Sequence, residues 1–72
     1  MSTWIRKSGR TLTRLNNSVN GNPRYLVTFS DGTSYRTSSD ASISYGIENR
    51  TFDGDVEIQL TRNGLISYMR AV

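Results

Sequence analysis

The feature that most constrains the fold is a short run in which large apolar side chains alternate with smaller or polar ones. Tyr25, Val27 and Phe29 occupy the odd positions, and an Asp-Gly pair, Asp31-Gly32, closes the run. Successive side chains of a β-strand point to opposite faces, so this spacing predicts a strand with one buried face. Because Asp-Gly favours a tight turn, we predict that the strand opens an antiparallel hairpin.

The length of the hairpin loop decides which side chains share a face, because a shift of one residue moves every side chain across the sheet. A two-residue loop would set Val27 opposite Arg36 and mix core with charge. A three-residue loop with Gly32 in the left-handed region sets Val27 opposite Tyr35 instead. We therefore predict the three-residue loop. The side chains that it leaves on the outer face are those of Arg24, Leu26, Thr28 and Arg36.

A second hairpin is predicted where apolar residues alternate over 56–60 and Asn63-Gly64 follows. Two loop lengths fit this turn. A three-residue loop sets Ile58 opposite Tyr68, and a two-residue loop sets Ile58 opposite Met69. Both partners are large apolar residues, so the pattern leaves the register of this hairpin undecided.

Between the hairpins, the stretch SSDASISYGIEN predicts one short helix. Ser39 or Asp40 would be its N-cap, and Asn49 would end it. Ile43 and Ile47 stand four residues apart, which places them on one helical face directed at the core.

Near the N-terminus, residues 4–6 and 11–15 predict one or two further strands. The order of elements predicts a single mainly β domain over residues 1–72, a small five-stranded antiparallel barrel with one short helix between strands 3 and 4. An OB-like Greek-key barrel and an SH3-like barrel both fit this order, and the choice between them stays open.

The composition excludes several classes of function. The 72 residues contain no Cys and no His, so disulfides, thiolate metal sites and the usual catalytic triads are absent. The one carboxylate cluster, Asp53, Asp55 and Glu57, lacks the number of oxygen ligands that calcium takes. We therefore expect a protein that is not an enzyme and uses no cofactor, metal or small-molecule substrate. No apolar run approaches the roughly 20 residues of a membrane span, so we expect no membrane partner and a cytoplasmic location.

The charges are distributed unevenly, and this asymmetry suggests a partner. Residues 1–30 contain five basic residues and no acid, and eight of the nine basic residues of the chain are arginines. Arginine side chains combined with aromatic rings suit phosphate contact and base stacking, so the leading hypothesis is nucleic-acid binding. The residues predicted to contact nucleic acid or another partner are Trp4, Arg6, Lys7, Arg10, Arg14, Arg24 and Arg36.

Apolar residues outside the predicted core support an alternative from a different class. Leu26 is predicted on the outer face between arginines, and Ile5 and Leu15 have no assigned core position. Such residues suit a protein interface, so the alternative is a protein-interaction factor that binds a host protein or a second copy of the chain.

The stretches NSVNGNPRYLVTF and DGTSYRTSSDASISYGIEN resemble small uncharacterised proteins of actinobacterial phages. The resemblance covers about residues 16–49. It implies expression inside a bacterial host, and it implies no activity, fold or binding residue.

Overall fold

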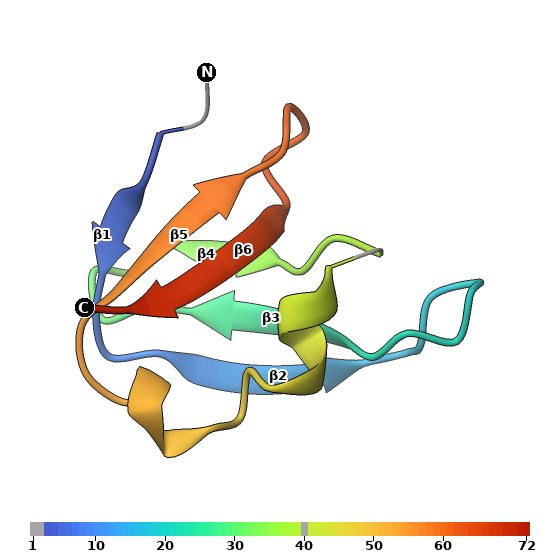
Figure 1. Cartoon of the computed structure of the whole chain (residues 1–72), viewed down its shortest axis with the longest axis horizontal. Helices are drawn as coiled ribbons and strands as arrows, with labels where there is room; N and C mark the ends of the chain where they lie inside the picture. The colour runs from blue at the N-terminus through green and yellow to red at the C-terminus, as the bar shows by residue number, and fades with distance from the viewer. Residues whose placement is uncertain (1–2, 40) are drawn as a thin grey trace.

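A computed structural model describes residues 3–39 and 41–72 of the chain. Within these residues the protein is mainly β, with six strands in two three-stranded antiparallel sheets of order β1-β5-β6 and β2-β3-β4 (Figure 1). The elements are β1 (Ile5–Lys7), β2 (Thr11–Leu15), β3 (Arg24–Thr28), β4 (Ser34–Arg36), the 3-10 turns η1 (Ser42–Tyr45) and η2 (Arg50–Phe52), β5 (Val56–Leu60) and β6 (Ile66–Ala71).

The N-terminal region differs from the predicted five-stranded arrangement because it contributes a strand to each sheet. β1 pairs with β5 and β2 pairs with β3. Between them, Gly9 has a φ of +66°, and a Cβ at this position would lie 2.8 Å from Cβ of Ser30. Only glycine fits so close a contact in this backbone conformation, so the chain bends here and passes from one sheet to the other.

The first hairpin confirms the predicted register. The amide of Phe29 donates to the carbonyl of Thr33 at 2.9 Å, Gly32 has a φ of +89°, and Val27 lies opposite Tyr35. Tyr25, Val27 and Phe29 are all buried, as predicted.

The second hairpin combines the two registers that the sequence left undecided. Its tip closes over three residues and sets Leu60 opposite Ile66. A β-bulge between Gln59 and Leu60 then shifts the pairing, so that Ile58 lies opposite Met69. The bulge directs both Ile66 and Met69 into the core.

The predicted helix is wrong in type, because the described residues contain two 3-10 turns and no α-helix. Gly46 follows the first turn, and Asn49 caps the second turn by accepting from the amide of Thr51 instead of ending a helix. A glycine at this position costs a helix about 1 kcal/mol relative to alanine, and so short a segment follows its tertiary contacts. The proposed capping residue Asp40 lies outside the described residues, and the first turn has no side-chain cap from Ser39.

The core forms where the two sheets and the segment between them meet. Ile47 is fully buried and Ile43 packs against the core, so the predicted apolar role of this pair holds without a helix. Both 3-10 turns contact β6. The buried cluster consists of Tyr25, Val27, Phe29, Ile47, Val56, Ile58, Ile66 and Met69.

A backbone contact between the residues just after β4 and strand β6 joins the two sheets. Thr37 forms a parallel bridge with Ile66, and the amide of Ser38 donates to the carbonyl of Ile66 at 2.8 Å. Thr37 is fully buried, and its hydroxyl accepts from the amide of Tyr25 at 3.0 Å. The described residues form no closed barrel, but this contact holds the two sheets against one core.

Candidate nucleic-acid interface

The outer face of the sheet β2-β3-β4 brings together four residues that the sequence assigned to it. Leu26 lies opposite Arg36 on β4 and opposite Thr13 on β2, while Arg24 lies opposite Leu15. Strand β2 adds residues that the pattern of the first hairpin alone could not place. We call this surface the open face, and its residues are Thr11, Thr13, Leu15, Arg24, Leu26, Thr28, Ser34 and Arg36.

The two arginines of the open face have no acidic neighbour on it. The side chains of Arg24 and Arg36 make no ion pair or hydrogen bond with any described residue, and Arg36 is exposed. Arg24 is half-buried, and its Nε is buried without a hydrogen-bond partner. The face therefore carries a charge of +2 with no internal counterion, which suits phosphate or carboxylate groups of a partner.

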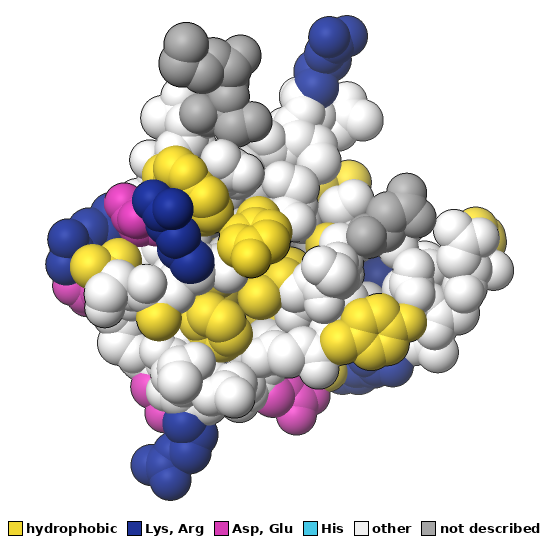
Figure 2. All heavy atoms as spheres, viewed as in Figure 1, with side chains coloured by type: hydrophobic (Ala, Val, Ile, Leu, Met, Phe, Trp, Pro, Cys, Tyr) yellow, Lys and Arg dark blue, Asp and Glu magenta, His cyan; other side chains and the backbone are white. Residues whose placement is uncertain are grey.

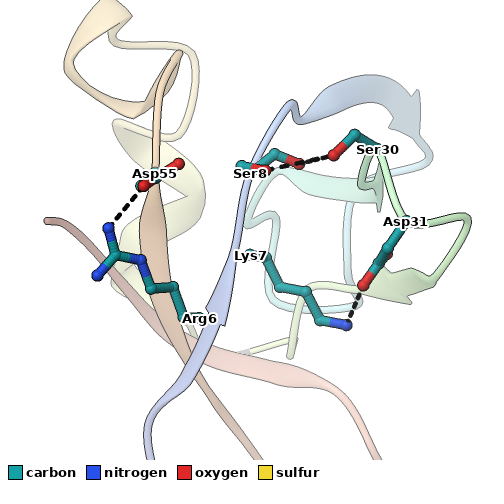
Figure 3. Close-up of a pocket in the computed structure, with 6 residues that line it drawn as sticks. All are labelled: Arg6, Lys7, Ser8, Ser30, Asp31 and Asp55. Atoms are coloured by element: carbon teal, nitrogen blue, oxygen red, sulfur yellow. Dashed lines mark hydrogen bonds and ion pairs between the residues drawn. The ribbon is translucent and has the colours of Figure 1, made fainter.

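Arg6 and Lys7, which the sequence also assigned to the interface, are engaged within the protein. Arg6 pairs with Asp55 at 2.6 Å, and Lys7 pairs with Asp31 at 2.7 Å (Figure 3). The hydrogen bond with each carboxylate raises the pKa of Arg6 and of Lys7. The Lys7 side chain also lies over the ring of Tyr35, so it holds the first hairpin against β1.

A polar pocket of about 260 Å³ lies beside these pairs (Figure 3). Its walls combine two cations, two carboxylates and two hydroxyl groups. Each cation already faces a carboxylate, and the pocket therefore presents no uncompensated charge to a ligand. Its lining residues are Arg6, Lys7, Ser8, Ser30, Asp31 and Asp55.

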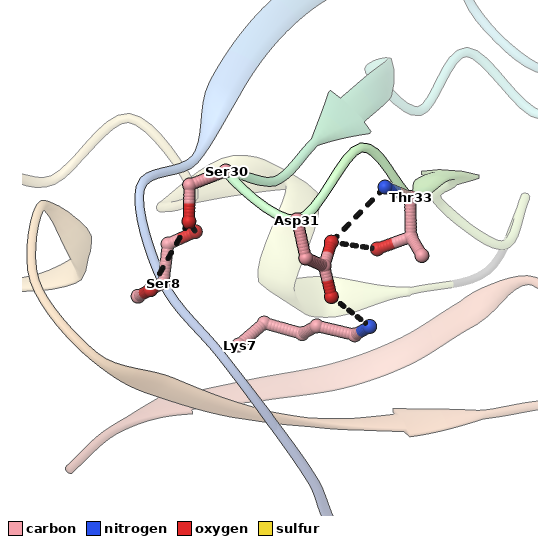
Figure 4. Close-up of polar contacts among 5 residues, drawn as sticks. All are labelled: Lys7, Ser8, Ser30, Asp31 and Thr33. Atoms are coloured by element: carbon pink, nitrogen blue, oxygen red, sulfur yellow. Dashed lines mark hydrogen bonds and ion pairs between the residues drawn. The ribbon is translucent and has the colours of Figure 1, made fainter.

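Both carboxylate oxygens of Asp31 accept hydrogen bonds from other residues of the protein (Figure 4). One carboxylate oxygen accepts from Lys7, and the other accepts from the amide and hydroxyl of Thr33. These bonds, with that from Lys7 the largest contribution, hold the pKa of Asp31 well below its usual range. Ser8 and Ser30 lie beside it with their hydroxyl oxygens 3.3 Å apart.

Arg10 and Arg14 are also engaged within the protein. Arg10 pairs with Asp53 at 3.2 Å and donates to the carbonyl of Asn49 at 2.9 Å, and only 9% of its side chain is exposed. Arg14 donates to the side chain of Asn17, and its guanidinium lies 5.3 Å from the ring centre of Tyr25. Arg10 therefore anchors the segment before β5 rather than facing solvent.

Trp4 belongs to the opposite outer face, which we call the paired face. The guanidinium carbon of Arg70 lies 3.7 Å from the ring centre of Trp4, and Tyr68 meets Trp4 edge-on at 5.8 Å. Figure 2 shows hydrophobic side chains gathered on the side of the molecule where β5 and β6 lie in front. The paired face consists of Trp4, Arg6, Asp55, Glu57, Gln59, Tyr68 and Arg70.

Tyr25 is unsuited to base stacking because it is buried in the core. Its hydroxyl donates to Glu48, and this bond is the main cause of its raised pKa. No aromatic residue lies on the open face, so base stacking on an aromatic ring is unavailable there.

The carboxylate cluster is neutralised by arginines. Asp53, Asp55 and Glu57 pair with Arg10, Arg6 and Arg70 respectively. Within residues 3–39 and 41–72, no three His, Cys, Asp or Glu side chains gather as metal ligands would. In the same residues, no helix has the length and apolar character needed to cross a membrane.

Comparison with known proteins adds no family to these observations. No protein-family model, no curated protein and no solved structure matches the chain.

Proposed function

We propose that this protein is a small non-enzymatic domain that binds single-stranded nucleic acid through the open face. The observation that carries the proposal is the pair Arg24 and Arg36, which share this face with no acidic residue and no internal partner among the described residues. Phosphate groups of nucleic acids are neutralised by such cationic side chains, and arginine can bind them with two parallel hydrogen bonds.

The course of the chain supports this proposal through its similarity to an OB-like barrel. β1 and β2 would form one first strand bent at Gly9, and β3 and β4 would be the second and third strands. The strands then follow a circuit from β1 through β5 and β6, across the bridge at Thr37, to β4, β3 and β2. OB folds bind oligonucleotides on the face of their second and third strands, which corresponds to the open face by analogy.

The shape of the open face favours a single strand over a duplex. A duplex is read in its major groove by a helix or a two-stranded ribbon, whereas the open face is the broad side of a three-stranded sheet. Leu15 and Leu26 give this side an apolar surface beside the two arginines. Unstacked bases can lie against such side chains and against guanidinium planes while phosphates contact the charges.

The test is a titration of fluorescently labelled single-stranded and duplex oligonucleotides at several salt concentrations. Two phosphate contacts predict a slope of about −1.4 for log K against log salt with a single strand, because each contact contributes about −0.7. Arg36→Ala is expected to reduce the magnitude of this slope by about 0.7 and to weaken binding about tenfold.

Arg50→Ala is the matched control, because Arg50 is 96% exposed on η2 and its loss removes the same charge. It is expected to leave the affinity within about twofold. Equal losses from both variants would show that only net charge matters, and absence of binding at low salt would contradict the proposal.

A second candidate function is protein binding, and the exposed part of Leu26 between Thr13 and Arg36 favours it. An apolar centre with arginine at its rim is typical of protein interfaces. Leu26→Ser should then abolish capture of one specific protein from nuclease-treated host lysate, whereas Val19→Ser, which changes an exposed apolar residue outside the open face, should not. Loss of capture on nuclease treatment alone would favour nucleic acid.

A further inference from the structure

Strand β2 has an unpaired edge. It pairs with β3 on one side, and no other backbone hydrogen bond in the described part of the chain reaches its residues. Thr11, Thr13 and Arg14 are exposed. The strand has no proline and no bulge, which are common protections of a sheet edge, and the guanidinium of its one charged residue, Arg14, is bound to Asn17 beside the ring of Tyr25. Its free edge can therefore accept another strand.

The pairing of β3 identifies which backbone groups face outward from β2. Tyr25 accepts a hydrogen bond from the amide of Thr37, on the side of β4. Backbone groups alternate between the two neighbours of a strand, so Leu26 directs its groups to Thr13, which lies opposite it on β2. The residues of β2 that direct their backbone groups to the free edge are then Leu12 and Arg14.

We propose that β2 pairs in antiparallel register with β2 of a second copy of this chain, about a two-fold axis at Thr13. This register sets Leu12 of each copy opposite Arg14 of the other. Because Leu12 and Arg14 direct their backbone groups outward, both exchange hydrogen bonds across the axis. The two Thr13 residues face each other as a non-hydrogen-bonded pair, and facing threonines are a favourable cross-strand pair.

Charge selects this register. A shift toward the C-terminus would set Arg14 opposite Arg14, and a shift toward the N-terminus would set Arg14 opposite Arg10. Like charges directly opposite each other destabilise a strand pair. The register centred on Thr13 sets Arg10 opposite Asn16, so the segment 10–16, which has two arginines and no acid, pairs with its own copy without repulsion between facing residues.

The symmetry of this dimer has a consequence for the open face. A two-fold axis perpendicular to the sheet keeps both outer faces on the same side, because it rotates the sheet within its own plane. The two open faces would therefore join across six strands and double the number of unpaired arginines on one surface. This consequence rests on the proposed function, whereas the pairing of β2 with itself does not.

Disulfide trapping without nucleic acid tests the pairing, because the chain has no native Cys. Facing residues of a non-hydrogen-bonded pair have Cα atoms about 4.5 Å apart, within the range of about 4.4–6.8 Å for a disulfide. Thr13→Cys should therefore give a covalent dimer on mild oxidation. Thr11→Cys is the matched control. In the proposed register its two cysteines are four positions apart along the strands, a separation of about 13 Å, so this variant should stay monomeric.

Sedimentation of the unmodified protein and of two Arg14 variants gives an independent measurement. Arg14→Pro removes an outward amide and should weaken the dimer at least about tenfold, whereas Arg14→Ala keeps the amide and should change it less than about threefold. Circular dichroism checks that both variants fold. Equal crosslinking of the two cysteine variants, or a monomer at every concentration, would overturn the proposal.

Discussion

The two outer faces of this molecule use the same residue types in opposite ways. On the paired face, Arg6 and Arg70 each meet a carboxylate, and Arg70 also covers the ring of Trp4. On the open face, Arg24 and Arg36 meet no acid within residues 3–39 and 41–72. An arginine in a sequence therefore does not indicate an interface until its neighbours across the sheet are known.

This difference separates stability from binding. Residues whose charges and rings are satisfied inside the molecule contribute to the free energy of unfolding, and residues without internal partners remain available to a second molecule. We expect substitutions on the paired face to lower stability with little effect on binding, and substitutions on the open face to do the reverse.

The largest effect is expected at the bend that separates the two faces. Gly9→Ala would place a methyl group 2.8 Å from Cβ of Ser30 in a left-handed backbone, so it should destabilise the protein by more than about 2 kcal/mol. Gly21→Ala is the control, because Gly21 has a similar φ of +81° with nothing within 4 Å, and it should cost about 1 kcal/mol. Thermal unfolding measures both. Equal losses would mean that no steric contact holds the bend.

Trp4→Ala should produce the next largest effect, and it sharpens the comparison most directly. It removes the ring beneath Arg70 and the edge contact with Tyr68, so we expect a loss of about 2 kcal/mol, or a fall of roughly 10 °C in Tm. The double substitution Arg24→Ala and Arg36→Ala should shift Tm by less than about 3 °C. A reversal of this order would contradict the division between the faces.

The Lys7 and Asp31 pair predicts a dependence of stability on pH. Because the pKa of Asp31 is lowered in the folded protein, its contribution is present above the ordinary value of 3.8 and is lost as the pH falls toward the folded value. Because the pKa of Lys7 is raised in the folded protein, its contribution is fully present below the ordinary value of 10.5 and is lost as the pH rises through the folded value. The difference in Tm between the natural protein and Asp31→Asn should therefore be constant near neutral pH and shrink in acid. A difference that grows in acid would show that the pair is not stabilising.

The smallest effect is expected for Arg50→Ala. Arg50 lies 3.7 Å from Asp53 across a solvent-exposed turn, and Asp53 keeps its pair with Arg10. Exposed ion pairs contribute little, so Tm should change by less than about 3 °C. A larger fall would show that the acidic segment before β5 depends on more than the pair of Asp53 with Arg10.

Local patterns in the sequence were sufficient for the strands and for one turn. The alternation around Val27 identified the buried face of β3, and Gly32 specified the loop that sets Tyr35 opposite Val27. Both follow from the geometry of adjacent residues. The helix prediction failed because the four-residue spacing of Ile43 and Ile47 does not require an α-helix. Both side chains reach the core while the segment forms two 3-10 turns.

The predicted interface changed because its residues were chosen by type. Four of the basic residues that we selected, Arg6, Lys7, Arg10 and Arg14, have partners from distant segments or neighbouring loops that no local pattern reveals. Leu15 and Thr13 were not assigned to the open face, although the alternation of residues 11–15 was visible, because their strand partner was unknown.

The sequence by itself determined that this is a small, mainly β protein and which side of β3 is buried, because strand alternation and turn conformation act over a few residues. Tertiary structure alone decided the bend at Gly9, the division into two sheets and which arginines keep their charge unpaired. These features depend on contacts between segments tens of residues apart, such as Arg10 with Asp53, and burial and electrostatics select such contacts only when the whole chain has packed.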